Sequence, residues 1–196
     1  LGFPLTHPNN GWLNLVGSNT RTGVVIPNSS VFEREDLFSF SFWIKMDKLT
    51  DAQDIISKYD NDNTTSREWV VRYDTDNSGT IRFTDSGGNH DLTAATVDDG
   101  NWNYVVIVLN GTTSKIHWYN SSGVLSSSSN FTLATTTTGA TPITIGGIWD
   151  NSDAQLREEA SDANFEGSID EVMYYAKALS PTEITKNYNH GKSKHS

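Results

Sequence analysis

The chain has 196 residues and carries 14 Lys and Arg against 24 Asp and Glu, which gives a formal net charge of -10 at pH 7. This acidic balance argues against nucleic acid and anionic membranes as partners, and it leaves cations and neutral sugars. The absence of Cys excludes disulfides and thiolate metal sites, and no apolar run approaches the roughly 20 residues that insert into a membrane. We expect one soluble domain over residues 1–196.

The first half of the chain predicts short strands separated by polar turns. Apolar residues at 12–15 and 24–26 give the first two. From Phe38 to Met46, large apolar residues alternate with Ser and Lys, which predicts a strand with one strongly apolar face. Trp43 falls on the other face of this strand, so we expect a loop to cover it. Further strands are expected at 54–58, 68–73, 80–84 and 92–97.

The second half predicts a buried hairpin and a short final helix. Residues 102–109 are almost continuously apolar, as in a strand covered on both faces, and Asn110-Gly111 then predicts a turn into a strand over 115–119. Strands over 143–148 and 168–175 follow. Ser180, Pro181 and Glu183 occupy the N-cap, first and third positions of a helix start, and Gly191 offers a stop.

The closing segment also carries a family resemblance. Its pattern Phe-x-Gly-x-Ile-Asp-Glu-Val, an aromatic pair, Ala-Leu-Ser-Pro and Glu-Ile resembles the end of laminin-G-like and pentraxin-like domains, and residues 101–123 are similar to their central hairpin. The resemblance implies a concanavalin A-like fold: an all-β, antiparallel jelly-roll β-sandwich, here with a short C-terminal helix. It does not fix an activity, because this fold hosts lectins, adhesion modules, glycosidases and lyases.

Three polar loops carry the oxygen ligands that calcium prefers. We interpret the loop with Asp74, Asp76 and Asn77 as a turn. In pentraxin-like domains an Asp-Asn pair and an acidic group after a later strand share calcium, and the resemblance implies this role for the other two loops. Their candidate ligands are Asp60, Asn61, Asp62, Asp150, Asn151 and Asp153. The alternative is that both loops are solvated hairpin tips. A calcium site here would have a weak affinity, about 0.1 to 1 mM.

Sugar binding needs an aromatic face beside polar groups. Trp149 adjoins one of the two acidic loops and Tyr59 adjoins the other, so both are candidate sugar contacts, and Trp69 is a further candidate. The alternative for each is packing in the core.

The carboxylates nearest to a glycosidase pair are Glu166, Asp170 and Glu171, but the adjacent Asp170 and Glu171 point to opposite faces of a strand. His190 and His195 lie in the tail. We therefore expect a non-catalytic module that binds carbohydrate or glycoprotein within a larger extracellular or surface protein. Two alternatives stay open: a structural or protein-adhesion domain, and a polysaccharide-cleaving enzyme.

Overall fold

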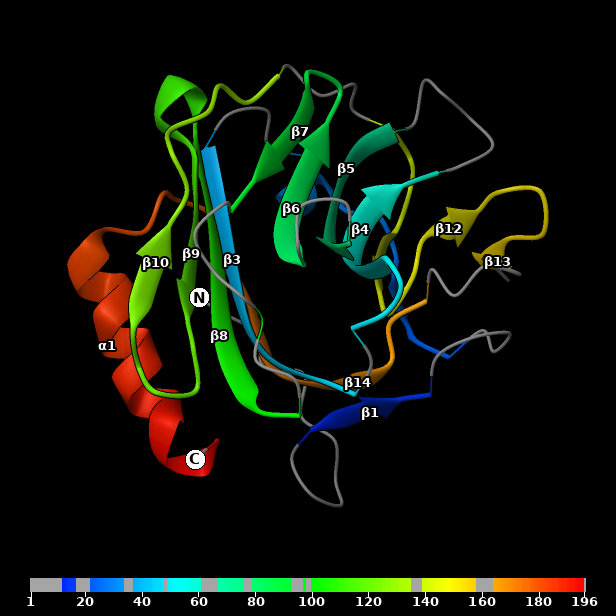
Figure 1. Ribbon diagram of the computed structural model, residues 1–196. Helices are drawn as coiled ribbons and strands as arrows, with labels where there is room; N and C mark the ends of the chain where they lie inside the picture. Colours follow the sequence, from blue (N-terminus) through cyan, green and yellow to red (C-terminus); the bar gives the residue numbers. More distant parts are fainter. Residues whose placement is uncertain are drawn as a thin grey trace.

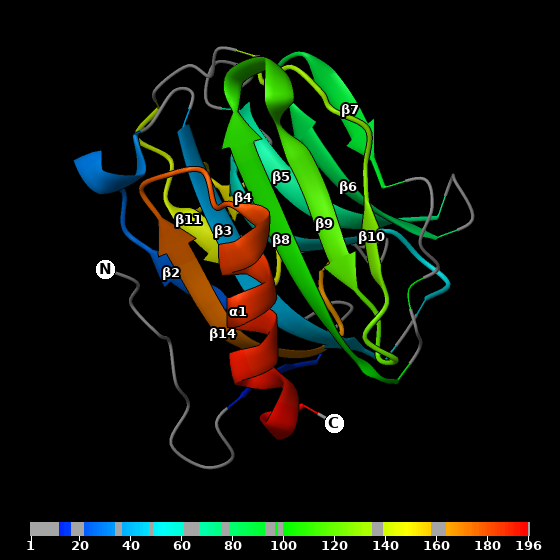
Figure 2. The ribbon, with the colours of Figure 1, turned by 90° about the vertical axis from the view of Figure 1, so that its left-hand side faces the viewer.

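The computed structural model describes residues 12–16, 22–33, 37–47, 49–60, 67–75, 79–92, 97, 100–134, 139–157 and 164–195. Over these residues two antiparallel sheets pack face to face, and one helix lies on the outer face of the first sheet (Figures 1 and 2). The predicted all-β jelly-roll β-sandwich with a short C-terminal helix is confirmed. No helix in these ranges is long and apolar enough to cross a bilayer.

The first sheet, sheet A, has the strand order β1-β14-β3-β8-β9-β10. Its strands are β1 (Leu13–Leu15), β3 (Leu37–Met46), β8 (Trp102–Asn110), β9 (Lys115–Tyr119), β10 (Leu125–Ser127) and β14 (Gly167–Tyr175). Sheet B has the order β2-β11-β4-β5-β6-β7. Its strands are β2 (Val24–Ile26), β4 (Gln53–Tyr59), β5 (Arg67–Asp74), β6 (Thr80–Asp85), β7 (Gly88–Asp91) and β11 (Ile143–Ile145).

A two-stranded hairpin and the helical segments complete the described chain. The hairpin is β12 (Trp149–Asp150) with β13 (Gln155–Leu156), and the helix is α1 (Pro181–Gly191). Three short 3-10 turns are η1 (Ser30–Phe32), η3 (Gly111–Thr113) and η4 (Lys192–Lys194).

The main core lies between the sheets and is rich in aromatic rings. Phe40 of β3 stacks on Trp69 of β5 with ring centroids 5.0 Å apart, and Trp69 in turn packs near Phe83 of β6. Only 4% of Trp69 is exposed. The sugar-contact role considered for Trp69 is therefore wrong: it shares the inner face of β5 with Val71 and Tyr73, because strand side chains alternate between faces.

The outer face of sheet A carries a second aromatic cluster, which the helix covers. Trp43 and Tyr119 pack against Tyr188 of α1, and the Tyr119 and Tyr188 rings stack with centroids 4.0 Å apart. The cover over Trp43 is thus a helix rather than the expected loop. Figure 2 shows α1 lying across the outer face of sheet A. His195, expected in a tail, is buried: it stacks on Trp43 at 4.4 Å, and its Nε2 lies 2.9 Å from Asp170 Oδ2.

The helix begins as predicted. Ser180 Oγ accepts a hydrogen bond from the Glu183 backbone N–H, and the Glu183 carboxylate accepts one from the Ser180 backbone N–H at 2.9 Å. Pro181 takes the first helical position. Gly191 has φ -84°, so it is not needed for a left-handed turn; η4 continues the chain beyond it. Glycine is required here because the Trp43 indole lies directly against Gly191 and leaves no room for a side chain.

Some expected boundaries differ for local reasons. Because the turn falls at Ser86 and Gly87, β7 spans Gly88–Asp91 and begins earlier than the strand expected at 92–97. Residues 93–96 of that expected strand lie outside the described residues. The hairpin turn after Asn110 is longer than two residues, since η3 precedes β9. Strand β11 ends at Ile145 because Gly146, at φ +96°, turns the chain. The polar segment after it forms the β12–β13 hairpin.

We expect Gly191→Ala to destabilise the fold. An added methyl group would lie 2.4 Å from Trp43 Nε1 and 2.8 Å from a Glu171 carboxylate oxygen, which corresponds to an overpacking cost of about 1 to 3 kcal/mol. Thermal unfolding would measure it. The control is Asn189→Ala, an exposed position in the same helix that should leave the fold as stable or slightly more stable. Equal stability of both variants would contradict the packing role of Gly191.

Acid should destabilise the fold partly through His117 of β9. Burial, and then the charge of Lys115, lower the pKa of His117 to about 4. The unfolded chain binds a proton at this residue below its ordinary pKa of 6.5, while the folded chain does not, so stability falls as pH drops from 6.5 to about 4. In His117→Gln, denaturant titrations should show that the free energy of unfolding falls less steeply with pH across this range. The difference in slope corresponds to up to about one bound proton. An unchanged slope would contradict this assignment.

Candidate functional site

The structure brings Asp60, where the first of the two acidic loops begins, beside the segment that leads into the second. Asp60, at the end of β4, forms a parallel bridge with Trp149, the first residue of β12. The β12–β13 hairpin therefore lies beside the end of β4, as Figure 1 shows. Of the predicted ligands in the first loop, Asn61 and Asp62 lie outside the described residues.

The two remaining aromatic candidates differ in what already covers them. Tyr59 is partly buried, and the Arg67 guanidinium lies 5.3 Å from its ring centroid. Trp149, at the start of the hairpin, is likewise partly buried, and the Arg67 guanidinium over Tyr59 is what distinguishes the two rings. Trp149 is therefore the better placed of the two to offer an aromatic face to a ligand.

The acidic groups at this end are largely occupied by structural roles. Asp60 is 2% exposed. Asp150 Oδ1 closes the hairpin turn by accepting hydrogen bonds from Ser152 N–H at 2.9 Å and Ser152 Oγ at 2.5 Å. Asn151 and Asp153 are exposed. Within the described ranges no group of three or more His, Cys, Asp or Glu could hold a metal ion. A calcium site at this end would therefore need ligands besides the described His, Asp and Glu side chains.

A buried ion pair anchors the strands beneath these loops. Lys58 of β4 pairs with Glu68 of β5, and neither side chain is more than 3% exposed. Glu68 also accepts a hydrogen bond from the Gly139 backbone N–H at 2.9 Å. Burial raises the pKa of Glu68, and the hydrogen bond from Lys58 opposes this only in part.

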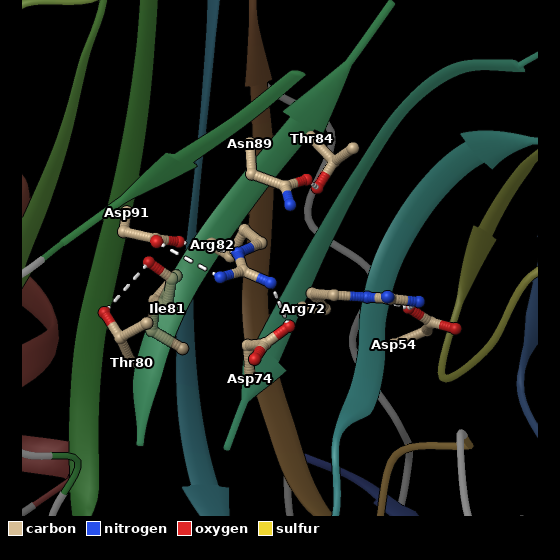
Figure 3. Close-up of polar contacts among 9 residues, drawn as sticks. All are labelled: Asp54, Arg72, Asp74, Thr80, Ile81, Arg82, Thr84, Asn89 and Asp91. Carbon is tan, nitrogen blue, oxygen red and sulfur yellow. Dashed lines mark hydrogen bonds and ion pairs between the residues drawn. The ribbon is translucent and has the colours of Figure 1, made fainter. Parts of the chain in front are cut away.

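The outer face of sheet B carries a second candidate surface, which we call the polar face. The strand register aligns one row across four strands: Asp54 of β4, Arg72 of β5, Arg82 of β6 and Asp91 of β7. Figure 3 shows these side chains projecting from neighbouring strands with Asp74, Thr84 and Asn89. Because the inner face of the same strands is the aromatic core, the polar side chains can only point outward.

Ion pairs hold the polar face in one geometry. Arg82 donates two hydrogen bonds to Asp91, at 2.6 and 3.1 Å, and a third to Asp74. Arg72 donates to Asp54 from two nitrogens, at 2.9 and 2.7 Å. Burial alone would lower the pKa of Arg72, but the charge of Asp54 and its hydrogen bond raise it. Both cations therefore stay charged and fixed.

The charges of this surface nearly cancel. Asp54, Asp74 and Asp91 surround Arg72 and Arg82, which leaves one excess negative charge. The neighbouring row adds neutral groups, with Thr84 Oγ1 donating to Asn89 Oδ1 at 2.8 Å. The polar face thus presents donors and acceptors without a free cation to attract an anion.

The hairpin borders the polar face on one side. Ser57 of β4 and Thr144 of β11 lie in the same row as Thr84, and both hydroxyls donate to the Gly147 carbonyl, at 3.2 and 2.6 Å. The segment leading to Trp149 therefore crosses this face over β4 and β11. Farther across the face, Arg82 is buried, whereas the Arg72 side chain is 33% exposed and Asn89 is exposed. Sequence reasoning missed the polar face, although Arg72 and Arg82 stand between apolar residues in two alternating strands.

Two of the three carboxylates considered for catalysis, Asp170 and Glu171, make ion pairs or hydrogen bonds with the C-terminal segment. Asp170 pairs with the buried His195, and Glu171 pairs with Lys194 at 2.6 Å. Glu171, at φ +49°, lies in a β-bulge of β14, which displaces it from regular strand geometry.

We expect Arg82→Met to lower the free energy of unfolding by about 3 kcal/mol, because it leaves two partly buried carboxylates without their cation. A triple variant that adds Asp74→Asn and Asp91→Asn removes those charges and should recover at least half of the loss. Urea titrations would measure both. A triple variant as unstable as Arg82→Met would show instead that the ion pairs themselves supply the stability.

Comparison with known proteins agrees with this architecture. Domain 4 of a GH43 extracellular arabinanase from Geobacillus stearothermophilus, solved with arabinotriose, has a TM-score of 0.61 and 19% identity, over 95% of this chain and 80% of that chain. The CBM40 of an IT-sialidase from Ruminococcus gnavus, bound to α2,3-sialyllactose, has a TM-score of 0.62 and 16% identity, over 90% of this chain and 95% of that chain. A SAP-like pentraxin from Limulus polyphemus has a TM-score of 0.50 and 11% identity, over 82% of this chain and 70% of that chain.

A search of curated protein sequences found no relative. The laminin G family model described as the concanavalin A-like lectin/glucanases superfamily matches residues 18–185. The match covers most of the chain, and the two-sheet fold, the C-terminal strand and the capped helix agree with it. This chain belongs to the concanavalin A-like lectin/glucanases superfamily.

Proposed function

We propose that this chain is a non-catalytic carbohydrate-recognition module of a larger extracellular protein, and that its glycan lies on the polar face of sheet B beside Trp149. The observation that carries the proposal is the row Asp54–Arg72–Arg82–Asp91 on the outer face of sheet B, which ion pairs hold in one geometry. Structures of similar fold were solved with arabinotriose and sialyllactose, which supports a sugar as the ligand class.

The geometry favours sugar hydroxyls as the bound groups. Side chains that already hold one another in place lose little conformational freedom when a ligand arrives, so each hydrogen bond contributes more to affinity. Trp149 can pack against the apolar side of a sugar ring while the polar face exchanges hydrogen bonds with its hydroxyls.

The charge balance favours a neutral glycan over an acidic one. Each guanidinium on the polar face already has a carboxylate partner, so a sugar carboxylate would have to displace that partner or approach an excess negative charge. We therefore expect neutral oligosaccharides to bind more tightly than sialylated ones.

Calcium dependence remains a separate part of the proposal. It would require Asp60 and Asp150 to act together with Asn61, Asp62, Asn151 and Asp153. Asp150 Oδ1 would then have to bind calcium while it also accepts the hydrogen bond from Ser152 N–H that closes the hairpin turn.

A glycan array probed with the purified chain, once with calcium and once with chelator, tests this function. We expect binding to neutral glycans. Loss of binding in chelator would support calcium at the loops, whereas retained binding would assign recognition to the polar face and Trp149 alone. Absence of any glycan binding in both conditions would contradict the proposal and favour a structural or protein-adhesion role.

For the best neutral glycan from the array, Trp149→Ala should weaken binding about tenfold, which is about 1.4 kcal/mol. Asn89→Ala should weaken it less, since one hydrogen-bonding group is lost. The matched control is Trp12→Ala, because Trp12 is 37% exposed and packs on Trp102 away from this surface. Calorimetric titration would give the affinities. Equal losses in Trp149→Ala and Trp12→Ala would count against the assigned site.

A further inference from the structure

An apolar cavity of about 400 Å³ lies between the two sheets, apart from the polar face. Residues from both sheets line it, including Ile26, Ile56 and Ile145 from sheet B and Phe40 and Val172 from sheet A. It lies toward the side of the sandwich where β14 faces β2 and β11.

The lining is almost wholly hydrocarbon. None of the described residues that line the cavity carries a charge. The Ser29 hydroxyl accepts a hydrogen bond from the Val31 backbone N–H at 3.5 Å, and the Tyr174 hydroxyl donates to the Val31 carbonyl at 3.1 Å. The polar groups at the cavity are thus turned toward the backbone of η1, and the remaining surface is aliphatic or aromatic.

Such a space is unusual within a packed core. Protein interiors are close-packed, and voids larger than a water molecule are few. Water gains nothing in a cavity without hydrogen-bonding partners, and apolar cavities of roughly 150 Å³ stay dry and accept benzene. A cavity of about 400 Å³ has room for a molecule of two or three rings, or a hydrocarbon chain of similar volume.

The turn η1 forms one wall, where Phe32 packs against the main core. No residue of η1 is buried, and Val31 is 52% exposed. Besides the Tyr174 hydrogen bond, Phe32 contacts the Tyr174 ring edge to face at 5.2 Å. Moving η1 outward would break these contacts while leaving both sheets paired.

We propose that this cavity binds an uncharged, mainly hydrocarbon small molecule, which enters beneath η1. A charged group would have to give up its hydration with no partner among the lining residues. Aromatic ligand rings would contact Trp69 and Phe40, which both line this space. This ligand is distinct from the glycan on the outer face of sheet B, so the two sites can be tested separately.

The test uses N-phenylnaphthylamine, a neutral three-ring fluorophore, titrated into the whole chain. We expect saturable one-to-one binding that raises the midpoint of thermal unfolding. Anilinonaphthalene sulfonate, which has similar rings and a negative charge, should bind at least about tenfold more weakly. Non-saturable fluorescence with no change in the unfolding midpoint would overturn the proposal, and so would equal affinity for the two probes.

Val172→Phe fills the cavity from β14 and should weaken binding of the neutral probe at least about tenfold. The matched control is Val124→Phe, at a site that is 58% exposed and does not line the cavity, and it should keep the affinity within about twofold. If both variants bind equally, the probe adsorbs elsewhere and the proposal fails.

Should Val172→Phe fail to fold, Trp69→Phe gives an independent readout. The phenyl ring at position 69 still lines the cavity, so direct excitation should show retained binding. Probe emission excited through tryptophan should fall more than in Trp12→Phe, which removes a tryptophan that does not line the cavity. An equal fall in the two variants would place the probe away from Trp69 and overturn the proposal.

Discussion

The stacking of Trp69 on Phe40 joins the two sheets and determines which way the strands of sheet B face. With ring centroids 5.0 Å apart, this contact lies within the larger aromatic stack that includes Phe38 and Phe83. Once these rings are inside, the side-chain alternation of β5 and β6 directs Arg72 and Arg82 outward. The same rings also bound the apolar cavity. One core contact thus positions both candidate binding surfaces.

The two sheets differ in how far their outer faces are covered. Sheet A is covered on both faces, by the core and by α1, and the contacts of Asp170 and Glu171 with His195 and Lys194 fasten its C-terminal cover. Sheet B leaves part of its outer face open. On that face, buried carboxylates hold two arginines at fixed positions, and a rigid surface of this kind lowers the conformational cost of binding a flexible oligosaccharide.

Features with local causes were predictable from the sequence. The strand with Phe38, Phe40 and Phe42 follows from period two, and the helix start follows from Ser180, Pro181 and Glu183. The pairing of Asp60 with Trp149 lay within reach only through the family resemblance, because strand ends far apart in the chain meet there. The row of Arg72 and Arg82, and the contact of His195 with Asp170, depend on register and packing that no local pattern encodes. Trp69 was misjudged for the same reason.

The most direct test of the central claim is to map where a bound sugar lies. Backbone amide signals of the isotope-labelled chain would be followed by NMR during titration with the tightest neutral glycan. We expect shift changes concentrated on β5, β6, β7 and the hairpin that carries Trp149. Changes concentrated on α1 and the outer face of sheet A, with sheet B unaffected, would contradict it.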